Sequence, residues 1–359
     1  MRRRALLRWL ASAGAAAIAE PVLAASDARY PPVVRGRTLA FPRDFGAHPD
    51  FRTEWWYLTG WLRAGERELG VQVTFFRSRT GHDDRNPSRF APKQLVLAHA
   101  AIALEGEARL RHDQRAARAG FGLALAGEED TEVFVDGWEL VRGPEDRYRA
   151  RIEARDFGIA LGFTPRTAPI LQGDAGFSRK GPLPEQASYY YSRPQLAVEG
   201  SVRLGAGDAA PLQAAGVAWL DHEWSSELLD ARAAGWDWVG LNLDDGSALM
   251  AFRIRSREGD VLWSHARWLA GTGDSAEPRF EPLRHWRSLR SGASYPVQMR
   301  VVVGPRVLEL HPLFDDQELD TRASTGTIYW EGAVRVHENG RRVGRGYLEL
   351  TGYAGTVRL

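Results

Sequence analysis

Three ionisable side chains stand side by side at Asp221, His222 and Glu223, and Trp219 and Trp224 flank them with large apolar rings. Removing a charge from water is costly unless the charge is paired, bound to a metal or neutralised by a shifted pKa. This composition therefore favours a pocket that holds an apolar ligand and moves a proton. A buried hydrogen-bonded cluster that fixes the end of a β-barrel is the alternative, and the sequence leaves both open.

Side chains alternate between the two faces of a β-strand, which divides these residues into two groups. Trp219, Asp221 and Glu223 are expected on one face, and His222 and Trp224 on the other. The pattern therefore predicts that Asp221 points away from His222 unless the strand bends at its end.

A second carboxylate stands between tryptophans at Trp236, Asp237 and Trp238. By the same alternation the two tryptophans share a face and Asp237 opposes them. Asp237 is therefore a second candidate acid. Tyr190, the middle of three consecutive tyrosines, is a candidate for ligand contact or for packing between strands.

One acid and three aromatic residues follow one another earlier in the chain: Glu54, Trp55, Trp56 and Tyr57. Alternation puts Trp55 and Tyr57 on one face of a strand and Glu54 and Trp56 on the other. Trp55 is a candidate for an aromatic plug at one end of a barrel. Glu54 is expected to pair with an arginine such as Arg115, or with His222.

Acid-catalysed hydration of a trisubstituted carbon–carbon double bond would use these residue types. A buried carboxyl with a raised pKa can protonate the double bond to a tertiary carbocation. Tryptophan faces stabilise a cation by roughly 0.5–2 kcal/mol each. Asp221 or Asp237 would donate the proton, Trp224 and Trp236 would stabilise the cation, and His222 would hold the water. The candidate catalytic residues are Asp221, His222, Glu223 and Asp237. The candidate ligand-binding residues are Glu54, Trp55, Trp56, Tyr57, Tyr190, Trp224, Trp236 and Trp238.

Short runs of alternating polar and apolar residues, separated by Gly, Pro and Asp turns, fill the chain from residue 30 onward. Helical periodicity is scarce. Many short strands with regular turns are typical of antiparallel sandwiches or closed barrels. We therefore predict an all-β protein with two antiparallel β-barrels packed together, one over residues 30–226 and one over residues 235–359.

The first 24 residues have the pattern of an export signal. Arg2, Arg3 and Arg4 precede an apolar stretch, and Val22-Leu23-Ala24 offers small residues for cleavage. Arg3 and Arg4 also fit a loose twin-arginine pattern. Residues 1–24 are therefore predicted to be a signal peptide that directs the chain to the periplasm or outside the cell.

Several function classes are disfavoured by composition. The 47 basic and 46 acidic side chains nearly balance, which gives no footprint for nucleic acid. The absence of cysteine excludes disulfides and thiolate nucleophiles. No His-x-His or His-x-x-x-His spacing favours a metal, so neither a metal nor a cofactor is expected. No Gly-x-Ser-x-Gly motif marks a serine hydrolase of the common α/β kind.

Several motifs together resemble one protein family: Glu54 to Gly60, Leu97 to Ala100, Gln172 to Gly181, Ser188 to Ser192, Gly216 to Ser226 and Gly346 to Tyr353. The chain is similar to the secreted lipocalin-like proteins of the AttH type, which include carotenoid 1,2-hydratase and kievitone hydratase. The resemblance implies two lipocalin-like barrels. It also implies a catalytic His-x-Trp pair, matched by His222 and Trp224, and a nearby aspartate. Asp237, Asp244 and Asp245 lie in that stretch, but no Tyr-x-Asp pattern marks one of them.

The leading hypothesis is an exported protein that binds an elongated apolar molecule, such as a lipid or an isoprenoid, and hydrates a double bond in it. One alternative is a non-catalytic periplasmic lipid carrier that serves an inner-membrane transport system. The second alternative is a secreted hydrolase in which a carboxylate activates water.

Overall fold

The computed structural model describes residues 30–82, 85–207, 209–227, 229–269 and 275–357. Within these residues the chain is all-β apart from one short 3-10 helix, η1 (Arg43–Phe45), which confirms the predicted fold class. None of the helices in the described part is long and apolar enough to cross a membrane. The predicted signal peptide, residues 1–24, lies outside the described residues.

The first sheet is antiparallel, and its strands follow the order β4-β3-β2-β1-β13-β12-β9-β8-β7-β6-β5, with β10 and β11 paired to β12. It curls so far that β3 and β4 approach β5 and β6, which makes a nearly closed barrel. Its strands are β1 (Thr53–Ala64), β2 (Arg67–Arg79), β3 (Gln94–Leu104), β4 (Arg111–Arg118), β5 (Ala124–Ala126), β6 (Glu132–Val135), β7 (Trp138–Arg142), β8 (Tyr148–Glu153), β9 (Phe157–Thr164), β10 (Ile170–Leu171), β11 (Phe177–Arg179), β12 (Ala187–Leu204) and β13 (Leu212–Ser225).

The second sheet is also antiparallel and forms a half-barrel in the order β17-β16-β15-β14-β23-β22-β20-β19-β18, with β21 paired to β22. Its strands are β14 (Ala233–Leu243), β15 (Ala248–Ser256), β16 (Val261–Leu269), β17 (Ser275–Ala276), β18 (Arg279–Arg287), β19 (Ser294–Val303), β20 (Arg306–Pro312), β21 (Glu318–Thr321), β22 (Thr327–Glu338) and β23 (Arg341–Leu350). The chain passes from the first sheet to the second between Ser225 and Ala233.

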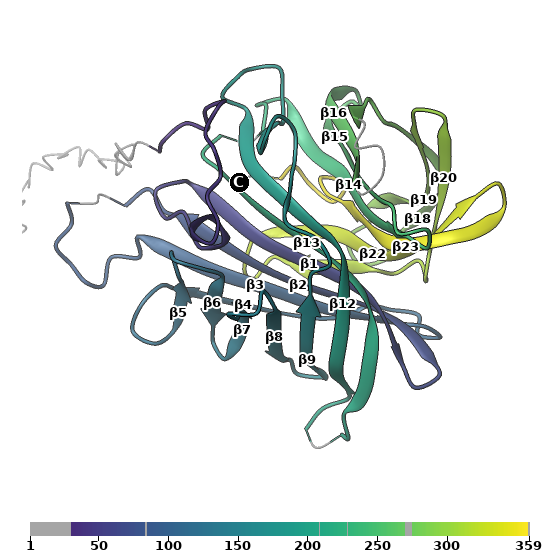
Figure 1. Cartoon of the computed structure of the whole chain (residues 1–359), viewed down its shortest axis with the longest axis horizontal. Helices are drawn as coiled ribbons and strands as arrows, with labels where there is room; N and C mark the ends of the chain where they lie inside the picture. Colours follow the sequence, from purple (N-terminus) through teal and green to yellow (C-terminus); the bar gives the residue numbers. More distant parts are fainter. Residues whose placement is uncertain (1–29, 83–84, 208, 228, 270–274, 358–359) are drawn as a thin grey trace, which may run out of the picture.

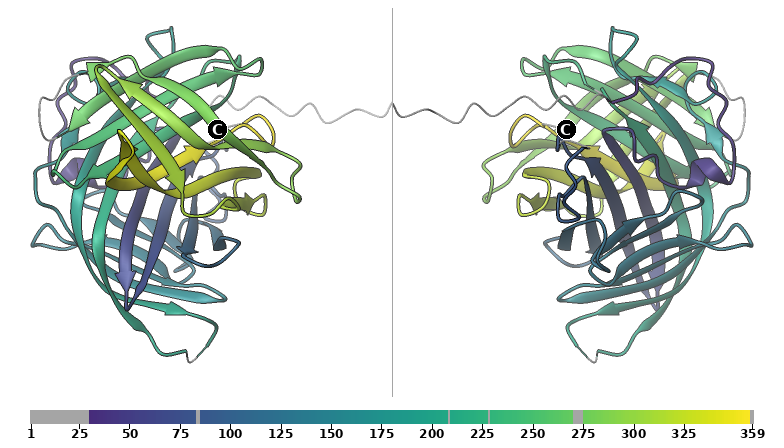
Figure 2. Two further views of the ribbon diagram at one scale, coloured as in Figure 1. Left: turned by 90° about the vertical axis from the view of Figure 1, so that its right-hand side faces the viewer. Right: turned by 90° about the vertical axis from the view of Figure 1, so that its left-hand side faces the viewer.

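The two sheets pack against each other along a few central strands. In Figure 1 the first sheet runs from purple to teal and the second from green to yellow, and Figure 2 shows the second sheet covering one side of the first. β1 and β2 meet β23 and β22, and β12 and β13 meet β14. Both faces of β1 and β13 are therefore buried: one face points into the interior of the first barrel, and the other packs against the second sheet.

The alternation along β1 shows this double burial. Trp56 and Leu58 belong to the apolar core inside the first barrel. Tyr57 and Trp61 belong to a separate apolar cluster between the two sheets. The sheets approach closely at Gly70, where a Cβ atom would lie 2.5 Å from the Tyr347 hydroxyl, so only glycine fits that contact.

Candidate functional site

A cavity lies between the two sheets, next to the residues that the sequence singles out. Its volume is about 110 Å³, within a hollow of about 800 Å³ that includes its opening to solvent. β1 contributes Trp55 and Tyr57 to its wall, and β14 contributes Trp236 and Trp238. Large aromatic rings thus form much of the lining, as is usual for sites that bind apolar ligands.

Four carboxyl groups also line this cavity. Asp221 and Glu223 come from β13 of the first sheet, and Glu331 and Glu349 come from β22 and β23 of the second. The first three are buried, and Glu349 is partly buried. A carboxylate is costly among aromatic rings, so each group must be neutral or paired.

Asp221 is buried but rich in hydrogen bonds. The Tyr190 hydroxyl donates to its Oδ2 at 2.5 Å, and the Trp219 indole N–H donates to its Oδ1 at 2.7 Å. The Ser192 hydroxyl donates to Oδ1 as well. Burial raises the pKa of Asp221 to about 7, although these three donors act in the opposite direction. Asp221 therefore exchanges its proton near neutral pH.

Glu331 is held by a single donor. The Tyr57 hydroxyl donates to its Oε1. Its Oε2 is buried and has no hydrogen-bond partner among the described residues. Burial, and then the neighbouring charge of Glu349, raise the pKa of Glu331 well above its usual range. Burial without a counter-charge therefore favours the protonated, uncharged form of Glu331.

The other two carboxyl groups of the cavity, those of Glu349 and Glu223, have different partners. The Trp236 indole N–H donates to Glu349 Oε2 at 3.0 Å, and burial raises the pKa of Glu349 to about 7. Glu223 instead forms an ion pair with the Lys180 ammonium at 2.9 Å. Lys180 also lies over the Tyr190 and Phe252 rings, with its nitrogen 4.6 and 4.2 Å from their centroids. The cavity thus combines three carboxyl groups of raised pKa with one buried ion pair.

His222 and Trp224 lie on the opposite face of β13, inside the first barrel, as alternation predicts. His222 Nε2 is hydrogen-bonded to Glu54 Oε1 at 2.8 Å, and His48 Nδ1 is bonded to the same oxygen at 2.7 Å. The His48 ring stacks on Trp224 at 3.7 Å, and Trp56 stacks on His222 at 4.6 Å. These five side chains are packed in a solid interior away from the cavity.

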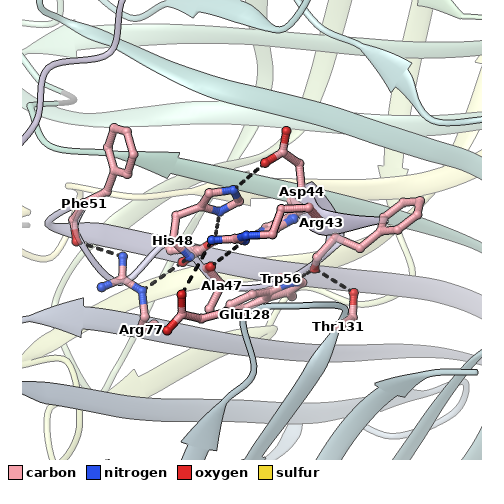
Figure 3. A network of polar contacts seen from close by, with 12 residues as sticks. Arg43, Asp44, Ala47, His48, Phe51, Trp56, Arg77, Glu128 and Thr131 are labelled. Atoms are coloured by element: carbon pink, nitrogen blue, oxygen red, sulfur yellow. Dashed lines mark hydrogen bonds and ion pairs between the residues drawn. The ribbon is translucent and has the colours of Figure 1, made fainter. Parts of the chain in front are cut away.

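Glu54 is the centre of that buried network, part of which Figure 3 shows. Its Oε2 accepts hydrogen bonds from Arg77 Nε and from the His48 backbone N–H, both at 2.8 Å. Burial is the largest single effect and raises the pKa of Glu54, but the two histidines and Arg77 together outweigh it and hold this pKa well below its usual range. The prediction of His222 as a partner is confirmed. The predicted arginine is wrong: Arg77 takes the place of Arg115, which pairs with Asp113 and Asp136 instead.

The same three residues are close enough to be considered as metal ligands. One donor atom each from His48, Glu54 and His222 lie within 4.8 Å of one another. Because Glu54 is ionised, the histidine nitrogens that face it must carry protons, and His222 Nδ1 then accepts from the Tyr191 hydroxyl at 3.0 Å. The arrangement is a satisfied hydrogen-bond network, which does not favour a metal.

Asp237 lies outside the cavity, on the face of β14 that opposes Trp236 and Trp238, as alternation predicts. Its carboxylate is fully buried between Arg253 Nε at 2.7 Å and Arg255 Nε at 3.0 Å. Both carboxylate oxygens are thus occupied by guanidinium donors. This position does not favour the predicted role of Asp237 as a proton donor.

The structure thus divides the predicted site residues into two groups. Asp221, Glu223, Trp55, Tyr57, Trp236 and Trp238 line the cavity, and Tyr190 supports it through Asp221. Glu54, Trp56, His222, Trp224 and Asp237 do not line it. Trp55 therefore does not plug the first barrel.

Three ionisable residues of the cavity are missing from the sequence prediction: Lys180, Glu331 and Glu349. Glu331 directly follows Tyr329 and Trp330. An acid beside consecutive aromatic residues, as at Glu54, was the signal that could have identified it.

Comparison with known proteins gives a consistent result. The family model described as AttH-like matches residues 32–353. The crystal structure of an AttH-type protein from Nitrosomonas europaea is 50% identical, covers 90% of this chain and 99% of its own, and superposes with a TM-score of 0.83. Comparison with curated protein sequences finds no match.

Two solved structures of low identity share the fold. Kievitone hydratase from Nectria haematococca is 13% identical with a TM-score of 0.67, and covers 90% of this chain and 95% of its own. CghA bound to Sch210972 is 12% identical with a TM-score of 0.51, and covers 84% of this chain and 89% of its own. At these identities the likeness shows the fold alone. The family model and the similarity to the Nitrosomonas protein together establish that this chain belongs to the AttH-like family.

Proposed function

We propose that this protein binds an elongated apolar molecule between its two sheets and adds water across a carbon–carbon double bond of that molecule by acid catalysis. The observation that carries this proposal is Asp221, which has a pKa of about 7 in the wall of an aromatic cavity. Strongly perturbed acids in a cleft are typical of catalytic sites.

The cavity suits each stage of such a reaction. An uncharged carboxylic acid can protonate an alkene, which leaves a tertiary carbocation. The faces of Trp55, Trp236 and Trp238 can stabilise this cation by roughly 0.5–2 kcal/mol each. A second carboxyl group can then take a proton from the attacking water. The cavity volume of about 110 Å³ suits the reacting end of the ligand, and the rest of the ligand would extend through the opening.

The comparisons support the proposal only at the level of fold and family. The protein named kievitone hydratase shares the two-sheet architecture. The family resemblance points to hydration of isoprenoid or prenyl chains. We further propose, from the pattern of residues 1–24, that the chain is exported to the periplasm or secreted.

Incubation of the purified protein with geranylgeraniol in 18O-labelled water tests the reaction. Mass spectrometry should detect an alcohol product that contains one labelled oxygen. The Asp221→Asn variant should bind the same probe but form product at a rate lower by about 10²–10⁴-fold, as for loss of a general acid or base. Binding of the isoprenoid by the wild-type protein without any product would favour the lipid carrier over the hydratase.

A further inference from the structure

We propose that Glu331 donates the proton in this hydration and that Asp221, on the facing sheet, accepts the proton from the attacking water. This assignment rests on the proposed function and names which carboxyl group performs each step. The candidate acids of the sequence analysis do not include Glu331.

The hydrogen bonds of Glu331 leave one oxygen free to donate. The Tyr57 hydroxyl occupies Oε1, so the proton of the neutral acid lies on Oε2. Oε2 is buried and has no partner among the described residues, and Glu331 is one of the residues that line the cavity. An unpartnered polar atom in a buried site carries a free-energy cost and is therefore rare without a function. Because this O–H has no acceptor among the described residues, we assign it to a double bond in the cavity.

The hydrogen bonds of Asp221 favour the opposite role. Two donors occupy Oδ1 and one occupies Oδ2, so all three favour the carboxylate form. A proton bound to either oxygen of Asp221 would compete with at least one of these donors for that oxygen. Asp221 is therefore better suited to receive a proton than to offer one.

Tyr57 links the two groups through strand pairing and a hydrogen bond. Tyr57 on β1 lies directly beside Asp221 on β13. The Tyr57 hydroxyl reaches across to Glu331 on β22 of the second sheet. A ligand between the sheets would therefore have the acid on one wall and the base on the other.

The steps balance in atoms and charge. The π electrons of the alkene take the proton from Glu331 Oε2, which forms a C–H bond and leaves a tertiary carbocation and a Glu331 carboxylate. The Tyr57 hydroxyl, already bonded to Oε1, stabilises that carboxylate. A lone pair of water forms the C–O bond, and the proton released from this water passes to the Asp221 carboxylate. Proton exchange with solvent then restores both carboxyl groups, and the net change is addition of one water.

Turnover of geranylgeraniol by the Glu331→Gln variant tests the donor directly. The amide keeps the size of the side chain and an acceptor for Tyr57, but it cannot supply an acidic proton. We expect kcat to fall about 10²–10⁴-fold with KM little changed. Glu318→Gln is the matched control, because Glu318 is also buried in the second sheet but accepts from Ser288 outside the cavity. Its kcat should equal that of the wild type.

Binding of N,N-dimethyldodecylamine tests the placement of Glu331 without turnover. The ammonium group mimics the tertiary cation and should pair with a Glu331 carboxylate. Calorimetry in buffers of different ionisation enthalpy should show about one proton released per amine bound by the wild type near pH 7. Glu331→Gln should release fewer protons and bind the amine roughly 30-fold or more weakly, as for loss of one partner of a buried pair. The hydrocarbon in which a C–H group replaces the amine nitrogen carries no charge, and it should bind the wild type and Glu331→Gln with equal affinity.

The outcomes separate the two claims. An inactive wild type contradicts the proposed function. An active wild type whose Glu331→Gln variant keeps its kcat contradicts only the assignment of Glu331. Equal amine affinity in the wild type and Glu331→Gln contradicts that assignment as well.

Discussion

Replacement of His222 by alanine distinguishes a catalytic histidine from a structural one. The motif resemblance assigns His222 to catalysis, whereas the structure places it inside the first barrel. It is fully buried, and its Nε2 donates to Glu54. We expect His222→Ala to lower the stability of the fold much more than the turnover of the folded protein.

The magnitude follows from two losses. Glu54 keeps its negative charge and its contacts with Arg77 and His48 but loses one buried donor, and loss of a hydrogen bond to a charged group typically costs about 1.5–3 kcal/mol. The missing ring also leaves a void between Trp56 and Trp224, whose rings lie 4.6 and 4.9 Å from that of His222. Large-to-small changes in a core cost about 3–5 kcal/mol themselves. Because both losses occur at one site and the surroundings relax, we expect the free energy of unfolding to fall by about 5 kcal/mol in total.

Urea unfolding followed by tryptophan fluorescence measures this change. Tyr191→Phe is the matched control, because it removes only the hydroxyl that bonds to His222 Nδ1. It should cost about 0.5–1.5 kcal/mol, as for a single neutral hydrogen bond. Turnover by the folded fraction of His222→Ala should stay within roughly tenfold of the wild type, which is about 1.4 kcal/mol of activation free energy.

A His222→Ala variant that unfolds at the wild-type urea concentration but has lost its turnover would refute this reasoning. The reactive centre would then lie inside the first barrel, and the cavity between the sheets would not be the site.

The remaining predictions concern charge and packing. Burial raises the pKa of Asp221 and of Glu349 to about 7, whereas the pKa of each group in the unfolded chain is about 4. The neutral forms of these two groups contribute stability that is complete below about pH 4 and is lost as the pH rises through about 7. Asp221→Asn and Glu349→Gln should therefore each reduce the decrease in unfolding free energy between about pH 4 and about pH 7. Asp237→Asn should lower that free energy by about 3–5 kcal/mol without loss of turnover, because Arg255, which is buried, and Arg253, which is partly buried, lose their counter-charge; unchanged stability would contradict the structural role. Gly70→Leu should destabilise the contact with Tyr347 by about 1–3 kcal/mol in urea unfolding; a wild-type midpoint would show that the sheets do not meet there.

Local sequence pattern predicted the strand faces at the site correctly. β13 and β14 are regular through Asp221 and Asp237, so alternation alone separates Asp221 from His222 and Asp237 from its flanking tryptophans. The all-β fold class follows from the same short alternating runs. These features depend on neighbours in the chain, which is why the sequence reveals them.

The location of the cavity could not be predicted in the same way. Both faces of β13 are buried near Asp221, because one side covers the barrel interior and the other meets the second sheet. The burial of these residues therefore does not indicate which face of β13 binds a ligand. The conspicuous pair His222 and Trp224 lies in solid core, whereas Glu331 contacts Tyr57 across a separation of 274 residues. No local pattern reports a contact over that distance.

The central claim is that the ligand binds between the two sheets and not inside the first barrel. A crystal structure of the protein with bound N,N-dimethyldodecylamine tests it most directly. We predict that the ammonium group lies between Glu331 and Asp221, with its alkyl chain along Trp236 and Trp238. An amine bound beside His222 within the first barrel would contradict the account.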